Sequence, residues 1–200
     1  MKIVVTGFGI FRDYTFNPSW EAVSGLPDVW DEERHTLYCE QIPVEYDFVL
    51  QKVPTKWTEI DPDFIVHVGV SHLADKLTLE KHAHNTGYDK PDVRSKCPPE
   101  QCCVPECPDT GRASCLDMEK LMVSVNEDCS KQNVGVEVCV SEDAGHYLCE
   151  FVYFKSLHAM SGKSLFVHVP EVGEGKPYSV QQMTSGLSVI IKNIISQMDK

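Results

Sequence analysis

The chain has 200 residues, of which 42% are hydrophobic, so it can bury the core of one α/β domain over residues 1–200. Its 18 Lys and Arg against 30 Asp and Glu give a net charge of −12, which repels phosphate backbones and anionic headgroups and argues against nucleic-acid and membrane partners. No signal peptide is recognisable, and no segment approaches the ~20 apolar residues of a membrane span, so we expect a cytosolic protein.

The first third of the chain predicts buried strands separated by helices. Three runs rich in β-branched and apolar residues are typical of buried strands, namely residues 2–6, 37–44 and 63–70. A helix is expected to start at Asn17–Ser19, with Pro18 near its first turn and an apolar run behind it. A second helix is expected over residues 45–60, where Pro54 is expected to kink or interrupt it.

The rest of the chain continues this alternation after an irregular excursion. Residues 77–85 predict a strand with Glu80 at its edge or in a cleft, and residues 86–112 shift to Pro, Gly, Lys, Asp and Cys, which indicates a long loop rather than a linker. The other expected elements are helices over 116–125, 151–160 and 179–198 and strands over 135–140 and 164–170. Together they predict a three-layer α/β/α sandwich with a twisted, mixed and mostly parallel sheet.

Cys149 is the first candidate for chemistry, because function in open α/β sheets collects in the loops at strand ends. It follows the strand at 135–140 and the turn SEDAGH, and it begins a predicted helix. The positive end of the helix dipole lowers the pKa of a thiol there, and the free N–H groups can bind an oxyanion. From position alone, a buried cysteine that packs as a small hydrophobe is the commoner alternative.

His168 and Glu80 are the partners that such a thiol would need. His168 lies near the end of the strand that comes 168 − 149 = 19 residues after the cysteine, so its imidazole could reach the sulfur. Glu80 could orient that imidazole and stabilise its charged form as the third member of a Cys-His-acid set. A core histidine and a solvated surface glutamate remain the alternatives for these two residues.

The motifs around these residues resemble those of pyroglutamyl peptidase type I, a family of cysteine peptidases that remove N-terminal pyroglutamate from peptides. The chain contains, in order, VTGFGIF, NPSWEAV, IPVEY, VHVGVS, LEKHAHN, SEDAGHYLCE and FVHVP, and the resemblance covers nearly its whole length. It implies a phosphorylase/hydrolase-like fold, with Cys149 as the nucleophile, His168 as its histidine and Glu80 as the acid. It also implies no metal and no cofactor.

The resemblance further implies how the substrate is held. Phe8 and Phe11 would sandwich the lactam ring, Tyr147 and Asn17 would match two further pocket positions, and the backbone near Val70 would bind the lactam N–H and C=O. This assignment suits pyroglutamate, a small lactam that carries neither a free amine nor a carboxylate on its ring. Without the resemblance, aromatic residues on such a loop are commonly core anchors.

The reaction expected from this set is acyl transfer to peptide substrates that begin with pyroglutamate. Cys149 would attack the pyroglutamyl carbonyl after His168 takes its proton, the N–H groups at the helix start would stabilise the oxyanion, and water would hydrolyse the thioester. Among the family's oligomeric states we favour a monomer, as the resemblance to animal members implies.

Several positions depart from the family pattern. Ile10 and Arg12–Asp13 replace a proline and a glycine pair in the pocket loop, and Glu150 follows the nucleophile where Asn or Asp is usual. Lys90 is the basic residue near the place where many microbial members have an arginine. The altered loop leaves open an impaired paralogue that binds pyroglutamyl peptides without cleaving them.

The nine cysteines are an odd number, which favours free thiols over a disulfide framework. Cys97, Cys102, Cys103 and Cys107 fall in CPPEQCCVPEC, a Cys- and Pro-containing insertion of the kind that animal members also have. Their spacing lacks the paired C-x2-C form of zinc sites, so we expect free thiols in a surface loop. A redox or zinc-storing protein built on this cluster is the alternative from another class.

Overall fold

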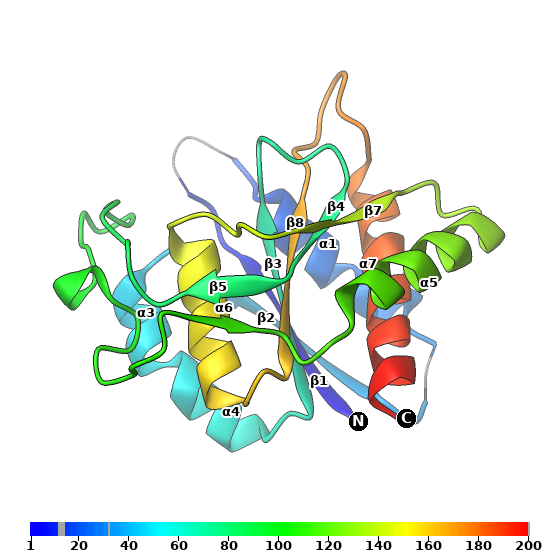
Figure 1. The fold of residues 1–200 in the computed structure, drawn as a ribbon. Coiled ribbons are helices and arrows are strands. Elements are labelled where there is room, and N and C mark those ends of the chain that lie inside the picture. The colour runs from blue at the N-terminus through cyan, green and yellow to red at the C-terminus, as the bar shows by residue number, and fades with distance from the viewer. Residues whose placement is uncertain (12–14, 32, 200) are drawn as a thin grey trace.

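The computed structural model describes residues 1–11, 15–31 and 33–199, and a six-stranded sheet runs through its centre (Figure 1). The strand order is β2-β1-β3-β8-β4-β7. The strands are β1 (Lys2–Phe8), β2 (Thr36–Ile42), β3 (Phe64–Val70), β4 (Leu77–Glu80), β7 (Val138–Ser141) and β8 (Ser164–Val169). Strands β2, β1, β3 and β8 are mutually parallel, whereas β4 pairs antiparallel with β8 and parallel with β7. The mixed, mostly parallel sheet that the sequence predicts is therefore confirmed.

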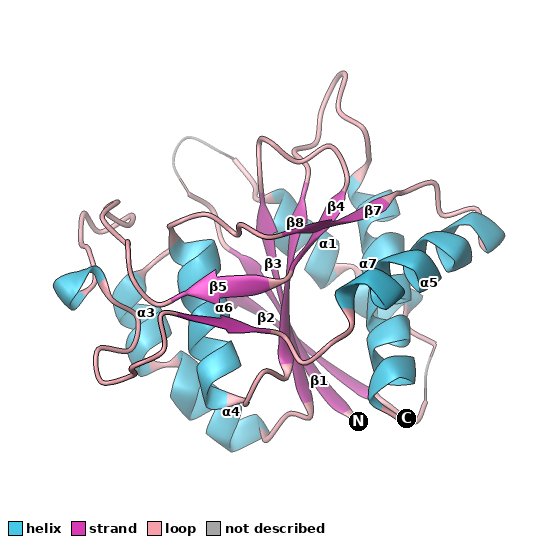
Figure 2. Cartoon of the chain, in the orientation of Figure 1, coloured by secondary structure: helices cyan, strands magenta, loops and turns pink. Residues whose placement is uncertain are grey.

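Helices cover both faces of this sheet (Figure 2). They are α1 (Pro18–Ser24), α2 (Leu26–Val29), α3 (Tyr46–Gln51), α4 (Val53–Ile60), α5 (Met118–Lys131), α6 (Leu148–Ala159) and α7 (Val180–Met198). Helices α1, α2 and α5 pack around α7, and α3 and α4 pack with α6. Successive side chains of β1 point to opposite faces of the sheet. Ile3 and Val5 join the core under α7, whereas Val4 joins the core under α6. These are the three layers of the expected sandwich.

Two predicted elements are divided in the structure. The strand predicted over 77–85 breaks at Lys81, after which β5 (His82–His84) leaves the main sheet and pairs antiparallel with β6 (Gly111–Ala113). The helix predicted over 45–60 breaks at Lys52, whose N–H closes α3 on the carbonyl of Phe48. Pro54 is therefore not the break itself, since it lies in the first turn of α4, where its missing N–H costs no intrahelical bond.

The remaining differences are shifts of element ends and a short helix in the excursion. Helix α5 continues to Lys131, beyond the predicted end at 125, and β7 begins at Val138 rather than at 135. The excursion over 86–112 is irregular apart from the 3-10 turn at Pro99–Gln101 and the start of β6. None of the described helices has the length and apolar content that crossing a membrane requires.

Candidate active site

Strands β4 and β8 bring Glu80 and His168 together. In the antiparallel pairing His168 lies opposite Thr78 and Glu80 opposite Phe166, which makes Glu80 and His168 diagonal neighbours on one face of the sheet. His168 Nδ1 donates to Glu80 Oε1 at 2.7 Å, and both residues are buried. In the described part of the chain Glu80 Oε2 is buried without a hydrogen-bond partner, so the carboxylate is committed to His168.

Cys149 is the second residue of α6, next to the end of β3. The first bond inside this helix runs from the N–H of Phe151 to the carbonyl of Tyr147 at 2.9 Å, so the N–H groups of the three residues before Phe151 precede the helical ladder. The sulfur lies close to Gly69, where an added Cβ would be 2.9 Å from Cys149 Sγ. A thiol in this place has backbone donors beside it for an oxyanion.

The direction of β7 changes how the cysteine and the histidine come to meet. Because β7 runs antiparallel to β8, the segment from β7 through α6 to β8 is not the parallel strand–helix–strand step that the sequence suggests. Helix α6 packs on β8 and leads directly into it, so the start of the helix and the end of the strand lie at the same edge of the sheet. The predicted proximity of Cys149 and His168 follows from this helix–strand hairpin.

The electrostatics of His168 favour its charged form. Burial lowers the pKa of His168. The interactions with Cys149 and Glu80 raise it by more than burial lowers it, so that the net pKa is about 9. At neutral pH the imidazole therefore carries a proton, which stabilises a neighbouring thiolate and can be transferred to a leaving amine. Cys149, His168 and Glu80 thus form a connected set of the kind that performs nucleophilic catalysis.

A small cavity of about 70 Å³ lies beside Cys149. Its lining includes all five residues that the sequence places in the pocket, with Val44 and Leu148: Phe8, Phe11, Asn17, Val70 and Tyr147. Apart from Asn17 and Tyr147 these side chains are apolar, which suits a compact group without formal charge. The structure therefore brings the candidate nucleophile and the candidate pocket together.

Asn17 has a defined role in shaping this cavity. Its side-chain amide donates to the carbonyl of Gly9 at 2.9 Å, and its Oδ1 accepts from the N–H and the hydroxyl of Ser19 at 3.1 and 2.8 Å. Ser19 Oγ in turn accepts from the N–H of Phe8 at 3.1 Å. These bonds cap α1 and fasten both ends of the loop that carries the aromatic side chains.

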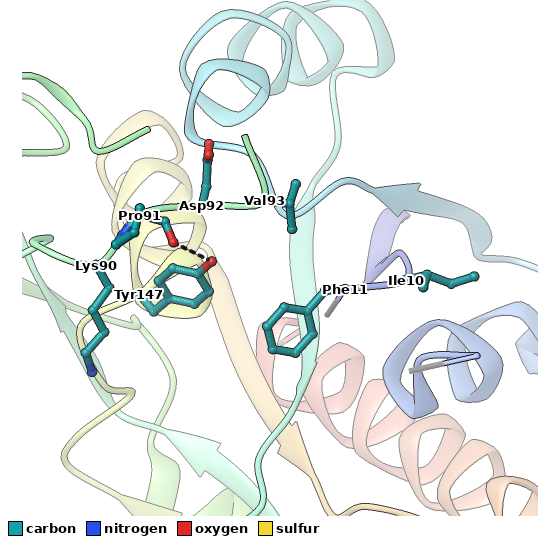
Figure 3. Close-up of a pocket in the computed structure, with 7 residues that line it drawn as sticks. All are labelled: Ile10, Phe11, Lys90, Pro91, Asp92, Val93 and Tyr147. Carbon is teal, nitrogen blue, oxygen red and sulfur yellow. Dashed lines mark hydrogen bonds between the residues drawn. The ribbon is translucent and has the colours of Figure 1, made fainter. Parts of the chain in front are cut away.

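A larger groove of about 750 Å³ adjoins the cavity, and the two share Phe11 and Tyr147 (Figure 3). Its far wall consists of residues 90–93 from the excursion, and Tyr147 Oη donates to the carbonyl of Pro91 at 3.1 Å. Ile10 lines the groove and is largely exposed. Arg12 and Asp13 lie outside the described residues.

Two features of the site are missed by reasoning from the sequence. Gly69 provides the space for Cys149 Sγ, and its signal is a glycine inside an otherwise apolar strand, which often marks a close approach. The fully buried Glu150 accepts from the Nδ1 atoms of His84 and His146 at 2.8 and 3.0 Å. The histidines are too far apart in the sequence for spacing to reveal this cluster.

The predicted cysteine cluster is spread over different environments. Cys97 is exposed, Cys107 is half-buried, and Cys102 and Cys103 are buried. The thiol of Cys103 donates to the carbonyl of Phe151 in α6 at 3.4 Å, and burial raises its pKa. All nine cysteines of the chain are free, and Cys103 acts as a packing residue under the excursion.

Comparisons with known proteins agree with these observations. A family model described as pyroglutamyl peptidase matches residues 1–196. The chain is 40% identical over 198 residues to Pyroglutamyl-peptidase 1 of Homo sapiens, covering 99% of this chain and 91% of that protein. It is also 27% identical over 201 residues to Pyrrolidone-carboxylate peptidase of Clavibacter michiganensis, covering 95% and 91%. A solved mutant pyrrolidone carboxyl peptidase from Pyrococcus furiosus superposes with a TM-score of 0.86 at 26% identity, covering 99% and 100%.

Proposed function

This chain belongs to the pyroglutamyl peptidase family and is a cysteine peptidase that hydrolytically removes N-terminal pyroglutamate, and we propose that Cys149, His168 and Glu80 carry out this reaction. The observation that supports this assignment best is the meeting of three residues from three elements beside one small cavity. Cys149 lies close enough to His168 to raise the pKa of the imidazole, and His168 is bonded to Glu80 at 2.7 Å.

The reaction begins with the thiolate form of Cys149, which the charged His168 stabilises. Attack of Sγ on the pyroglutamyl carbonyl forms the carbon–sulfur bond and moves the carbonyl π electrons onto oxygen. The N–H groups at the start of α6 stabilise this oxyanion. As the intermediate collapses, the carbon–nitrogen bond breaks and His168 gives its proton to the leaving amine.

Hydrolysis of the thioester completes the cycle. The neutral His168 accepts a proton from water, whose oxygen attacks the acyl carbon and displaces Cys149 as thiolate. Glu80 holds the imidazole through Nδ1 and stabilises the charge that it carries in both steps. Pyroglutamate leaves as the free acid, and the enzyme returns to the thiolate–imidazolium pair.

The cavity supports recognition of the lactam ring, and the groove supports binding of the peptide that follows it. Phe8 and Phe11 supply apolar walls near Cys149, and a cavity of about 70 Å³ limits the group that can enter. The groove begins where the cavity ends, since Phe11 and Tyr147 line both. A peptide bound with pyroglutamate in the cavity would therefore place its next residues between the pocket loop and residues 90–93.

We also propose that residues 1–200 form a single catalytic domain that acts as a monomer in the cytosol. One sheet joins strands from both halves of the chain, which supports a single domain. The nine free cysteines are compatible with a reducing compartment. Sedimentation of the purified protein under reducing conditions tests the monomer.

Release of a fluorescent amine from a pyroglutamyl amide tests the reaction and its nucleophile. Wild type should hydrolyse this substrate under reducing conditions, Cys149→Ala should not, and Cys115→Ala, which removes an exposed thiol, should retain full activity. Cys149→Ala with full activity would exclude the proposed nucleophile. If the well-folded wild type binds the amide without cleaving it, the result would favour the alternative of an impaired paralogue that only binds pyroglutamyl peptides.

A further inference from the structure

A cluster of two histidines and one carboxylate lies beside the nucleophile but takes no part in the proposed reaction. Glu150 follows Cys149 in α6, His84 ends β5, and His146 lies in the loop before the helix. His84 Nδ1 is 2.8 Å from Glu150 Oε1, and His146 Nδ1 is 3.0 Å from Glu150 Oε2. One nitrogen from each ring and a carboxylate oxygen all lie within 4.8 Å of one another.

The carboxylate of this cluster is buried and oriented before any ligand arrives. Glu150 is fully buried, and the backbone N–H of His84 also donates to its Oε1 at 3.0 Å. Across the described ranges its ion-pair partners are the two histidines and not a lysine or arginine. A buried carboxylate without a permanent cation is a strong ligand for a mobile one.

The two histidines are accessible from outside, which allows an ion to enter and leave. The side chain of His84 is 42% exposed and that of His146 is 49% exposed. Their rings are 5.7 Å apart between centroids and inclined by 52°, so both can turn toward a common point without stacking on each other. The cluster therefore has a fixed inner ligand and two adjustable outer ligands.

Two imidazoles and one carboxylate are a donor set for borderline divalent transition metals. Ligand atoms around tetrahedral Zn²⁺ are roughly 3.4 Å apart, as follows from bonds of about 2.1 Å. The present nitrogen–oxygen distances of 2.8 and 3.0 Å would have to open by about 0.5 Å, which the exposed rings can accommodate. Each imidazole would carry its proton on Nε2, because Nδ1 would donate its lone pair to the metal.

We propose that His84, His146 and Glu150 form a binding site for one divalent transition-metal ion of the zinc type, with water completing its coordination. The site is separate from the proposed catalytic groups, since His168 and Glu80 are bonded to each other on β8 and β4. It ties the first turn of α6 to β5 and to the preceding loop. Bound metal therefore stabilises the segment that positions Cys149.

Titration with Co²⁺ tests this site, because Co²⁺ replaces Zn²⁺ and its absorption distinguishes nitrogen and oxygen ligands from thiolates. The titration uses the full chain with Cys149→Ala, which removes the competing sulfur of the residue before Glu150. We expect saturable uptake of one equivalent without a thiolate-to-cobalt charge-transfer band. His84→Ala and His146→Ala should each weaken binding by more than about tenfold, since a lost ligand costs at least as much as a lost outer-shell partner.

His82→Ala is the matched control, because this ring packs 5.2 Å from that of His84 but lies outside the proposed ligand set. It should bind Co²⁺ like the parent protein. A charge-transfer band at the first equivalent would assign the ion to cysteines and overturn the proposal. No saturable uptake, or equal affinity in both histidine variants and the parent, would also overturn it and leave the cluster as a hydrogen-bonded bridge.

Discussion

Gly69→Ala tests how closely β3 approaches the candidate nucleophile. The added Cβ would be 2.7 Å from Phe166 Cζ and 2.9 Å from Cys149 Sγ, and both distances are shorter than real Cβ contacts. Phe166 is fully buried, with its ring 4.7 Å from that of His168 and 6.0 Å from that of Tyr153, so it has little room to retreat. The methyl group must therefore displace the sulfur, the ring or both.

Two opposing contributions determine how the free energy of unfolding of Gly69→Ala differs from that of the wild type. Overpacking a close-packed core costs about 1–3 kcal/mol, and replacing a strand glycine by alanine returns about 0.5–1 kcal/mol of conformational entropy. The free energy of unfolding should then fall by up to roughly 2.5 kcal/mol, with a central value of about 1 kcal/mol. A displacement of the sulfur by several tenths of an ångström should lower kcat/KM by about 10- to 100-fold, since a misplacement of 1 Å can cost about 100-fold.

Urea unfolding and hydrolysis of a pyroglutamyl amide measure these two effects. Gly9→Ala is the matched control, because a Cβ there meets its nearest neighbour at 3.6 Å, an ordinary contact. Its unfolding free energy should not fall. If Gly69→Ala unfolds at the wild-type urea concentration and keeps the wild-type kcat/KM, the close approach between β3 and α6 is refuted.

Three further predictions concern the hydrogen bonds of the site. Glu80→Gln removes the charge that helps to raise the pKa of His168, so kcat should fall by about 10²–10⁴-fold, as measured by steady-state kinetics. The raised pKa of His168, about 9 against about 6.5 unfolded, contributes stability that is present below pH 6.5 and lost as pH rises through 9. The difference in unfolding free energy between wild type and His168→Gln should therefore shrink by on the order of 3 kcal/mol from pH 6 to pH 10. Asn17→Ala removes the bonds that fasten the pocket loop, so stability should fall by about 0.5–2 kcal/mol and KM should rise more than kcat falls.

Each of these has an outcome that contradicts it. Glu142→Gln, which breaks an exposed salt bridge to Lys81, should keep full activity, and equal activity in Glu80→Gln would remove the acid from the mechanism. A pH-independent difference between wild type and His168→Gln would show that His168 is not held in its charged form. Unchanged KM in Asn17→Ala would separate the capping bonds from substrate binding.

The central strands could be predicted from the sequence because their signal is local. Runs such as IVVT at residues 3–6 are buried on both faces, and this burial favours apolar, β-branched residues at consecutive positions. The break at Lys81 has no such signal, since β5 leaves the sheet in order to pair with β6, almost 30 residues further along the chain. Long-range pairing also sets the reversed direction of β4 and β7, which no local pattern encodes.

In the candidate site, too, some features have a local signal in the sequence and others depend on long-range contacts. Cys149 and His168 could be paired from their positions at a helix start and a strand end, and the motifs of the family supported Glu80 and the pocket residues. The space at Gly69 and the Glu150 cluster depend on tertiary approaches between β3, β5 and α6, so single-sequence reasoning does not find them. The roles of Phe8, Phe11, Asn17, Val70 and Tyr147 stay predictions until the variants are measured.

The strand order sets a condition on when the enzyme can become active during synthesis. Strand β8 is the last of the six strands in the chain, yet it lies between β3 and β4 and supplies His168. Until residues 164–169 have left the ribosome, β4 and β7 have no strand that joins them to β1 and β3. A nascent chain that already contains Glu80 and Cys149 therefore lacks both the histidine and the sheet that positions them. Activity should appear only after residues 164–169 have emerged and joined the sheet.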